Sequence, residues 1–298
     1  MTTKQIFLTL LLLVFSSCGK EEFSDKTITA LSSNQESITN FTEQTNSTQV
    51  IPWGVERVGY GDGTGKRVWI MDYGVDAKHP DLNVDTILSK NFFGYNSKET
   101  EDIFNHGTCI AGVVAAKDNG FGVRGVAAGA SVISIKMAFI YDFGFKDAVD
   151  YMISKYKKGD VVIIASAQAP HQVDVRNEQA IIKLANKGFR VVIAAGNSSV
   201  DVSTFSPQRL KHRNIFIISA FGQGDVFWSN SNFGAGVSYS QPGVSIYTTA
   251  AGGGYGTYSG TSFSAPHFAG LLLLGRIISG GNVVNDKDSS PDIIAIKR

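Results

Sequence analysis

The chain carries apolar runs separated by more polar segments, and this pattern predicts short buried strands that alternate with helices. Five continuous apolar runs are typical of strands covered on both faces, since a strand with one solvent-facing side would alternate apolar and polar residues. Segments with helical character lie between the runs. The alternation predicts an α/β fold with three α/β/α layers around a mostly parallel central sheet. The runs are 68–71, 132–135, 161–164, 191–195 and 215–219, and the helical segments are 107–116, 146–155 and 178–187.

The N-terminus has the pattern of an export signal. Lys4 supplies a positive start, residues 6–15 are apolar, and Ser16 and Ser17 are small residues that precede Cys18. The apolar stretch is too short for a comfortable transmembrane helix. We therefore interpret this segment as a signal peptide.

The segment after Cys18 is polar, and its composition separates it from the rest of the chain. Ser, Thr, Asn, Gln and Glu dominate it, so it cannot bury a core and is expected to be a flexible tether. The chain then divides into a signal peptide at 1–17, a tether at 18–48 and a folded domain at 49–298.

Composition and charge exclude several classes of protein. The 298 residues could hold one large α/β domain with appendages or two small domains, and a hydrophobic fraction of 43% with a mean hydropathy of +0.01 suits a globular protein with a substantial core. A formal charge of +1 gives no support to nucleic acid as a partner. Only two cysteines occur, Cys18 and Cys109, so no disulfide framework supports the fold. We expect a monomer.

One hydroxyl, that of Ser262, lies among small residues at the predicted start of a buried helix. Gly260 allows a tight turn before it, and Pro266 is tolerated within the first turn of a helix. The positive end of the helix and its free N–H groups would favour negative charge forming on a substrate oxygen. Serine is also a common residue at the start of helices, so the local sequence alone leaves both interpretations open.

Three motifs together resemble those of the subtilisin-like serine peptidases. The stretch 259–270, Ser-Gly-Thr-Ser-Phe-Ser-Ala-Pro-His-Phe-Ala-Gly, is similar to the family's nucleophile motif. The stretches 68–82 and 105–112 are similar to its aspartate and histidine motifs, in the family's order. The resemblance implies that Ser262 is the nucleophile, His106 the base and Asp72 the carboxylate that orients it. Asp72 directly follows the first apolar run, as expected for a site at the carboxyl ends of parallel strands.

The resemblance also implies an oxyanion hole. Residues 194–197, Ala-Ala-Gly-Asn, close the fourth apolar run and are similar to the family's oxyanion motif. The side-chain amide of Asn197 and the backbone N–H of Ser262 would donate to the developing negative oxygen. Taken alone, Gly-Asn is also a common turn.

The family pairs its peptide substrate with an edge strand, and the corresponding residues here are 166–169, Ser-Ala-Gln-Ala. The family has glycines at the end of this strand, whereas Gln168 brings a side chain into the space beside the peptide. We expect a narrowed groove that still binds substrate by strand addition. The predicted substrate-binding residues are Ser166, Ala167, Gln168 and Gly196.

A loop after the predicted histidine helix resembles the family's structural calcium loop. The match implies amide oxygens from two side chains, one carboxylate and three backbone carbonyls, an all-oxygen shell that suits Ca²⁺. A Gly-Asn turn without an ion is the alternative. Catalysis needs no cofactor. The predicted calcium ligands are Gln49, Asp81, Lys117, Asn119, Phe121 and Val123.

Two positions beside the predicted catalytic residues depart from the family. Tyr73 stands where Ser or Thr is usual next to Asp72, so the hydrogen bonds around this carboxylate are expected to differ. Cys109 stands where a histidine is usual, three residues after His106 on the same helix face. We expect either a thiol near the imidazole or a small buried apolar residue.

Four further histidines compete for the role of base. His79 lies in a His-Pro-Asp-Leu turn and His267 lies inside the predicted buried helix. His171 and His212 lie in polar surroundings without a motif. We expect all four to be structural or solvated.

The residues Phe15-Ser-Ser-Cys18 resemble a bacterial lipoprotein cleavage box, which implies lipidation of Cys18. An ordinary signal peptide with an incidental cysteine is the alternative. The following Gly-Lys-Glu-Glu resembles acidic signals that direct lipoproteins to the outer face of an outer membrane. We therefore expect an exported protein, lipid-anchored at a bacterial outer membrane or cell surface, and otherwise secreted or periplasmic.

The sequence favours a serine endopeptidase that hydrolyses peptide bonds through an acyl-enzyme, with a peptide or protein as substrate. The alternative is a catalytically weak or inactive surface lipoprotein that uses the peptidase scaffold to bind a peptide or a protein partner. The unusual groove speaks for this alternative. So does the stretch between Cys18 and Pro52, which is too short for the family's usual inhibitory pro-segment.

Overall fold

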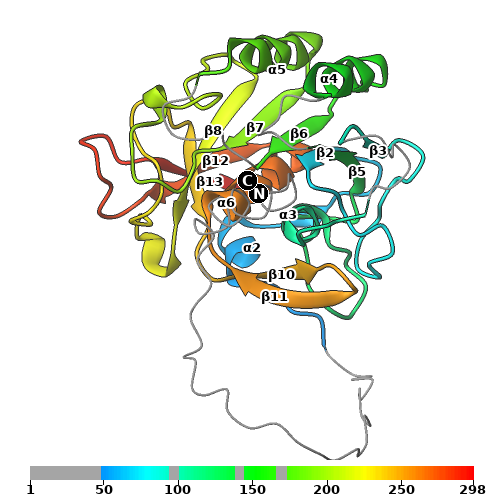
Figure 1. The fold of residues 1–298 in the computed structure, drawn as a ribbon. Coiled ribbons are helices and arrows are strands. Elements are labelled where there is room, and N and C mark those ends of the chain that lie inside the picture. The colour runs from blue at the N-terminus through cyan, green and yellow to red at the C-terminus, as the bar shows by residue number, and fades with distance from the viewer. Residues whose placement is uncertain (1–47, 94–100, 138–143, 166–172) are drawn as a thin grey trace, which may run out of the picture.

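Nine strands form one twisted sheet at the centre of the protein (Figure 1). The structure is a computed structural model that describes residues 48–93, 101–137, 144–165 and 173–298. The strand order is β12-β13-β9-β8-β7-β6-β2-β5-β3, and every neighbouring pair is parallel except β12 and β13. The strands are β2 (Arg67–Asp72), β3 (Lys90–Asn91), β5 (Ser131–Lys136), β6 (Val161–Ile164), β7 (Arg190–Ala194), β8 (Ile215–Phe221), β9 (Tyr239–Pro242), β12 (Ile277–Asn282) and β13 (Ile293–Lys297).

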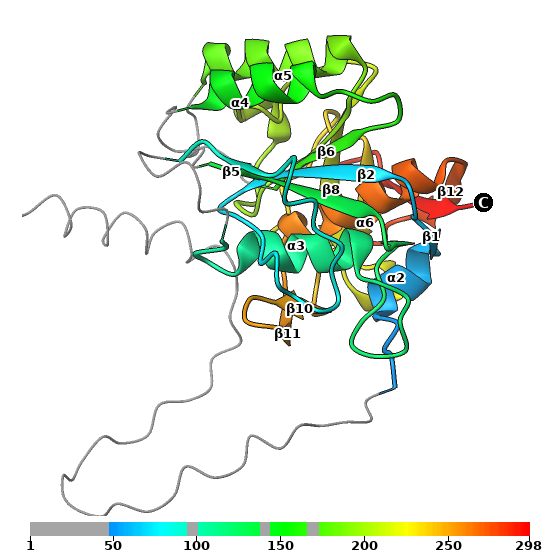
Figure 2. The ribbon, with the colours of Figure 1, turned by 90° about the vertical axis from the view of Figure 1, so that its right-hand side faces the viewer.

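Helices cover both faces of the sheet (Figure 2). On one face lie α4 (Phe145–Ser154) and α5 (Val175–Lys187). On the other lie α2 (Trp53–Val58), α3 (His106–Ala115) and α6 (Thr261–Leu274). The three-layer α/β/α fold with a mostly parallel sheet is confirmed.

Strand β2 shows why the central runs are apolar at every position. Successive side chains of a strand point to opposite faces. Val68 and Ile70 therefore join the hydrophobic core under α3 and α6, while Trp69 and Met71 join the core under α4 and α5. Both faces are dry from Val68 to Met71, so these four positions are apolar, and polar residues occur only at the two ends of the strand, Arg67 and Asp72.

Helix α6 runs through the interior, and every residue from Thr261 to Leu273 is buried. A helix that is apolar on all sides has no solvent face to present. The expected place of Pro266 in the first turn is wrong. The helix begins at Thr261, so Pro266 is its sixth residue, and its missing N–H leaves the carbonyl of Ser262 without the usual helical donor.

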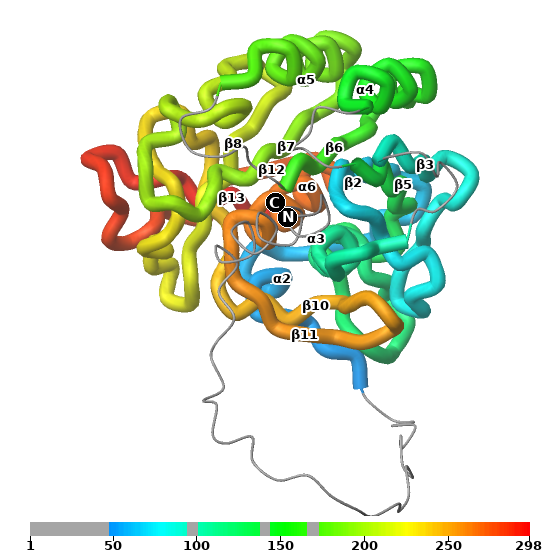
Figure 3. Tube along the Cα trace, in the orientation of Figure 1, coloured from blue at the N-terminus to red at the C-terminus, as the bar shows by residue number. Residues whose placement is uncertain are grey.

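The C-terminal segment forms the edge of the sheet (Figure 3). Strand β13, near the C-terminus, pairs with β9 and with the glycine-containing β12. The buried Asp292 precedes β13 and accepts a hydrogen bond of 2.5 Å from the hydroxyl of Ser219. The C-terminal segment is therefore part of the central sheet.

A hairpin outside the main sheet packs on α3. It consists of β10 (Ile246–Ala250) and β11 (Gly254–Tyr258), which pair antiparallel. The hydroxyls of Thr248 and Thr249 donate to the carbonyls of Cys109 and Thr108 at 2.9 and 2.7 Å. The remaining elements are β1 (Gly61–Asp62), which pairs with β4 (Ala127–Ala128), and the short 3₁₀ turns Val202–Thr204 and Gln223–Asp225.

Candidate active site

Asp72 and His106 form a hydrogen-bonded pair. Asp72 is the last residue of β2 and is 1% exposed. Its Oδ2 lies 2.8 Å from Nδ1 of His106, and its Oδ1 accepts a hydrogen bond of 2.8 Å from the backbone N–H of Tyr73. Both carboxylate oxygens are thus fixed, so the carboxylate can hold the imidazole in one orientation.

The loop before α3 places His106 at the first position of this helix. Asn105 adopts a left-handed conformation with φ of 65°, which asparagine tolerates better than most residues. Its amide donates to the hydroxyl of Tyr258 at 2.8 Å, and its carbonyl oxygen accepts from the N–H of Ala251. The hairpin of β10 and β11 therefore holds the residue that directs His106 toward Asp72.

Glycine is required at the second position of α3. A Cβ on Gly107 would lie 2.0 Å from the carbonyl oxygen of Gly74 and 3.2 Å from Cβ of Asp72. The helix can approach the end of β2 only without a side chain at this position. The absence of a side chain at Gly107 thus allows His106 to come within hydrogen-bonding distance of Asp72.

A second carboxylate, Asp102, lies near the pair and was missed by the sequence analysis. It accepts hydrogen bonds from the backbone N–H and the hydroxyl of Thr108 at 2.8 and 2.7 Å. Burial raises the pKa of Asp102, and the charge of Asp72 raises it further. The sequence feature that could have indicated Asp102 is its position four residues before His106, in the loop that precedes the histidine helix.

The electrostatics of the site act on the imidazole in opposing ways. Burial lowers the pKa of His106, whereas the charge of Asp72, the hydrogen bond to it and the charge of Asp102 raise it. The net result is a pKa above the ordinary value for histidine. The imidazole is therefore a stronger base than a free histidine.

Ser262 is the second residue of α6 and lies close to this pair. Its hydroxyl donates to the carbonyl of Ala165 at 2.8 Å, and Ala165 follows β6 beside the end of β2. The ring of His106 lies edge-on to that of Phe263, with centroids 6.1 Å apart. Within the described part of the chain, the Ser262 hydroxyl bonds to Ala165 and not to His106.

Asn197 lies beside the start of α6, where Thr261 orients its side chain. The N–H and the hydroxyl of Thr261 donate to Oδ1 of Asn197 at 2.9 and 2.7 Å. The same hydroxyl accepts from the N–H of Gly196 at 3.0 Å. These bonds fix the side chain of Asn197 beside Gly260 and the first turn of α6. A Cβ on Gly260 would lie 3.3 Å from the amide nitrogen of Asn197.

The predicted calcium ligands meet in one loop. Nε2 of Gln49 lies 2.7 Å from the carbonyl oxygen of Lys117 and 3.4 to 3.5 Å from oxygens of Asn119, Phe121 and Val123. Four oxygens thus converge on one point. Amide nitrogen and oxygen are interchangeable by a flip, so the Gln49 oxygen can replace the nitrogen at this point when a cation lies there.

The single carboxylate of the predicted ligand set is buried against this loop. Asp81 accepts from the backbone N–H of Val123 at 2.9 Å, from the amide of Asn119 at 3.0 Å and from the hydroxyl of Tyr255 at 3.3 Å. Burial raises the pKa of Asp81. No group of three or more His, Cys, Asp or Glu that could hold a metal occurs in the described residues. The donor set is therefore neutral oxygens and one carboxylate, which fits a hard cation such as Ca²⁺.

Comparison with known proteins identifies the family. A model of the subtilase family, Peptidase_S8, matches residues 63–276. The chain belongs to the subtilase family. The thermophilic serine proteinase of Bacillus sp. (strain AK1) is 35% identical over 71% of this chain and 52% of its own length. Subtilisin Savinase of Lederbergia lenta is 30% identical over 76% of this chain and 84% of its own length.

A solved structure supports the fold of this subtilase. The crystal structure of a cold adapted subtilisin-like serine proteinase superposes with a TM-score of 0.69 at 21% identity, covering 83% of this chain and 98% of that chain. The M-protease of Shouchella clausii (strain KSM-K16) is 30% identical, and the match covers 61% of it. The chain thus spans about half to three-fifths of the length of several relatives that it matches.

Several predicted residues of this subtilase lie outside the described residues: Cys18, Ser166, Ala167, Gln168 and His171. Gly196 lies within them and has a φ of 101°. A Cβ there would lie 2.4 Å from the amide nitrogen of Asn232, which donates to the carbonyl of Ala195 at 2.8 Å. This position therefore requires glycine.

The residues that depart from the family pattern lie as follows. The ring of Tyr73 packs edge-on against Phe104, with centroids 4.8 Å apart, and its backbone N–H bonds to Asp72. Cys109 is 1% exposed and belongs to the core under α3 and α6. The described surroundings of Cys109 are those of a small buried apolar residue.

The other described histidines make local contacts away from the Asp72 pair. Nε2 of His79 lies 2.9 Å from the carbonyl oxygen of Gly254. Nδ1 of His267 donates to the carbonyl of Phe263 at 2.7 Å. Nδ1 of His212 accepts from the N–H of Asn214 at 3.1 Å.

Proposed function

We propose that this subtilase is a serine endopeptidase that hydrolyses peptide bonds through an acyl-enzyme. The observation that carries the proposal is the 2.8 Å pair of Asp72 and His106 at the start of α3, with Ser262 at the start of the neighbouring helix α6. A hydroxyl, an imidazole and a buried carboxylate at one site are the groups that nucleophilic acyl transfer requires.

The first step is attack of the Ser262 oxygen on the substrate carbonyl. Rotation of the hydroxyl away from Ala165 brings it toward Nε2 of His106, and such catalytic hydrogen bonds often tighten only when substrate is bound. The imidazole accepts the hydroxyl proton, while Asp72 holds Nδ1–H and stabilises the imidazolium. The raised pKa of His106 favours this proton transfer.

The tetrahedral oxyanion is stabilised by hydrogen-bond donors fixed before the reaction. The amide of Asn197, oriented by Thr261, and the backbone N–H of Ser262 donate to it. His106 then protonates the leaving amine, the C–N bond breaks, and the acyl group remains on Ser262. Water, activated by the same imidazole, hydrolyses the ester and regenerates the hydroxyl.

The substrate is a peptide or protein that lies along the segment 166–168 and Gly196 as an added strand. Main-chain hydrogen bonds would supply affinity in this mode, and side-chain pockets would supply selectivity. We expect the side chain of Gln168 to narrow this groove. We expect Gln168→Gly to broaden cleavage of unselected peptides, and an unchanged cleavage profile would argue against this placement of the substrate.

The rival function is a surface lipoprotein that binds a partner through an inactive scaffold. Against it stands the fixed side chain of Asn197, which accepts two hydrogen bonds from Thr261 beside Ser262, since a surface that only binds a partner does not require a fixed amide at this place. A fluorophosphonate probe distinguishes the two functions, because it reacts only with an activated serine.

We expect the probe to label the wild-type chain and to leave Ser262→Ala unlabelled. Ser264→Ala is the matched control. Ser264 lies two residues after Ser262 in the same helix, and its hydroxyl donates to the carbonyl of Gln241 at 3.0 Å. The control variant should still label. A folded wild-type protein that never labels would support the binding function instead.

A structural Ca²⁺ ion and a lipid anchor complete the proposal. Gln49, Asp81 and Asn119, with the carbonyls of Lys117, Phe121 and Val123, would hold the ion, which would fix the loop that follows α3. No helix among the described residues is long and apolar enough to cross a membrane.

Lipid on Cys18 would keep the exported protein at an outer membrane or cell surface. Replacing Cys18 with serine should release the protein from the membranes of the producing cell. Continued sedimentation of this variant with membranes, at high salt as well as low, would contradict the anchor.

A further inference from the structure

Cations gather at the starting ends of four neighbouring strands. The segments 66–67, 155–160, 187–190 and 211–214 lie before or at the starts of β2, β6, β7 and β8, and they contain nine Lys or Arg and a single carboxylate, that of Asp160. We call these segments the basic edge. Its residues are Lys66, Arg67, Lys155, Lys157, Lys158, Asp160, Lys187, Arg190, Lys211 and Arg213.

The pairing of the strands puts these segments side by side. Val68 of β2 is in register with Val161 of β6, and Val161 with Arg190 of β7. The loop before β8 joins the row, because the N–H of Val191 donates to the carbonyl of Asn214 at 2.7 Å. The basic edge is therefore one continuous surface, although it comes from four separate parts of the sequence.

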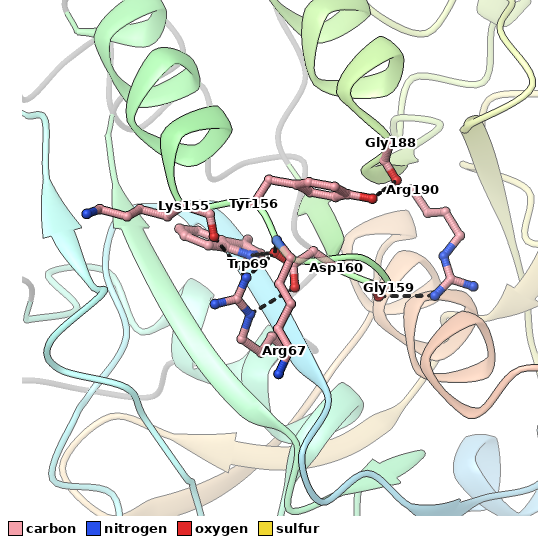
Figure 4. Close-up of polar contacts among 9 residues, drawn as sticks. Arg67, Trp69, Lys155, Tyr156, Gly159, Asp160, Gly188 and Arg190 are labelled. Atoms are coloured by element: carbon pink, nitrogen blue, oxygen red, sulfur yellow. Dashed lines mark hydrogen bonds and ion pairs between the residues drawn. The ribbon is translucent and has the colours of Figure 1, made fainter.

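Only one of the nine cations is neutralised by an ion pair within the described residues. Arg67 donates twice to Asp160, at 2.9 and 2.5 Å, and the indole of Trp69 donates to the same carboxylate at 3.0 Å (Figure 4). Asp160 is 2% exposed, so its charge serves this buried network. Figure 4 also shows Arg190 beside Gly159, whose carbonyl accepts from its guanidinium at 3.1 Å.

Favourable interaction with helix dipoles accounts for only two of the nine cations. Lys155 caps the end of α4 and Lys187 is the last residue of α5, and cations are favoured at such positions. Lys66, Lys158, Lys211 and Arg213 are exposed and lie at no helix end. Their presence at the same edge needs another reason.

The charge of the basic edge differs sharply from that of the whole molecule. Nine cations and one carboxylate give it +8, while the whole chain carries +1. The described residues carry 23 Lys or Arg and 19 Asp or Glu, a net +4, so the described part outside the basic edge carries −4. A charge separation of this size creates a directional field that orients the protein near an anionic surface.

We propose that the basic edge docks on a bilayer that carries anionic headgroups. A bilayer is favoured over a single bound anion, because the cations spread over four strand ends rather than converging on one point. It is favoured over a flexible polyanion such as nucleic acid, because the acidic remainder of the chain would repel a polymer that wraps around it. A flat bilayer would contact only the basic edge and would not approach the acidic remainder of the chain.

Docking in this manner would also orient the candidate active site. Asp72 and Ala165 follow β2 and β6 at their carboxyl ends, whereas the basic edge lies at the amino ends of the same strands. The site would thus face away from the bilayer. The inference stands whether or not Ser262 is a nucleophile and whether or not Cys18 carries lipid.

The test is co-sedimentation of the full chain carrying Cys18→Ser with phosphatidylcholine vesicles, with and without phosphatidylglycerol. The test variant adds Lys158→Glu, Lys211→Glu and Arg213→Glu. The control variant instead adds Lys78→Glu, Lys90→Glu and Lys146→Glu, which are exposed cations outside the basic edge. Both variants change the net charge equally, and the export signal is common to all proteins compared.

We expect binding to the anionic vesicles that weakens as salt is raised, and little binding to the neutral ones. Each cation near an anionic surface contributes about 1 kcal/mol, so loss of three cations alone weakens binding about a hundredfold, and the three introduced carboxylates should weaken it further. The control variant should bind much like its parent. Thermal unfolding and peptide cleavage, measured in parallel, should be the same for all three.

Three results would overturn the proposal. The first is equal binding of the parent chain to anionic and neutral vesicles. The second is an equal loss in the test and control variants, which would reduce the effect to net charge. The third is duplex DNA that binds the chain at least as tightly as the vesicles at the same salt, which would assign the basic edge to nucleic acid.

Discussion

The two ends of the same strands have opposite characters. At their carboxyl ends, β2, β6 and β7 lead into Asp72, Ala165 and Asn197, which are tied to other residues by short hydrogen bonds. At their amino ends they begin beside exposed, unpaired cations. One end is organised for chemistry in a nearly dry site, and the other presents charge to its surroundings.

The direction of the chain explains this difference. In a parallel sheet all carboxyl ends meet at one edge, and the helices that follow start near that edge. Ser262 and His106 accordingly lie at the first turns of α6 and α3, where free N–H groups favour a developing negative charge. The amino ends receive the ends of α4 and α5, which favour cations. Substitutions at the carboxyl ends of the strands should therefore leave vesicle binding unchanged, and substitutions at the amino ends should leave activity unchanged.

Asn197→Ala gives the largest expected effect among the following predictions. Loss of the oxyanion donor should lower kcat by roughly a hundred- to thousandfold, the size of the effect measured for the corresponding donor in subtilisin, a relative. KM and binding to anionic vesicles should change little. Steady-state kinetics on a peptide substrate measure the loss, and a decrease in vesicle binding would show that the two ends are coupled.

Acid should destabilise the interior around His267 of α6, whereas the Lys and Arg of the basic edge stay charged in acid. Burial lowers the pKa of His267 to about 4, so this residue stays neutral in the folded protein. The unfolded chain takes up a proton at its ordinary pKa near 6.5, and stability is therefore complete above pH 6.5 and falls as the pH drops toward 4. The loss amounts to about 3 kcal/mol.

Denaturant unfolding at a series of pH values measures this loss. The His267→Gln variant lacks the titrating group, so its stability should depend less on pH over the same interval, whatever its absolute stability. A variant with the same pH dependence as the wild type would assign the acid sensitivity to other groups.

Removal of calcium should destabilise the loop after α3. A ligand that binds only the folded state at a hundredfold excess over its Kd adds about 3 kcal/mol to the free energy of unfolding. We expect a chelator to lower the Tm of the wild type and to have no effect on Asp81→Asn. Asp118→Asn is the control, because Asp118 lies in the same loop but pairs with Arg124 at 2.7 Å. Its Tm should still respond to the chelator.

Asp102→Asn should have the smallest effect, on the pH profile. Activity requires neutral His106, so kcat/KM falls as the pH drops through the pKa of this residue. The charge of Asp102 contributes to the raised pKa of His106, and its removal should move the acid limb to lower pH by less than about one unit. Asp118→Asn should leave the limb in place. A limb that moves to higher pH would contradict the electrostatic role of Asp102.

The three-layer fold could be predicted because each central strand must be apolar at every position to pack against helices on both faces. The runs 161–164 and 191–195 match β6 and β7 to within about one residue at each end. The edge of the sheet was less predictable. The strand β12 contains two glycines and exposed positions, so it lacks the apolar pattern that revealed the central strands.

Only some of the residues that form and position the candidate site could be identified from the sequence. Asp72, His106, Asn197 and Ser262 lie in motifs whose spacing indicates their chemistry. Asp102, Asn105 and Thr261 were missed, because their roles depend on partners far away in the sequence, such as Tyr258 for Asn105. A local pattern carries no information about such long-range hydrogen bonds.

The sequence by itself determined which side chains this subtilase offers, which segments are buried and in what order the strands and helices follow. Only the tertiary structure decided which ends of those segments meet. The parallel pairing of β2, β6, β7 and β8 gathers Asp72, Ala165 and Asn197 at one edge and the cations of four distant segments at the other. The physical reason is that strand pairing is a contact between residues far apart along the chain, and its register fixes neighbours that no local pattern of residues can specify.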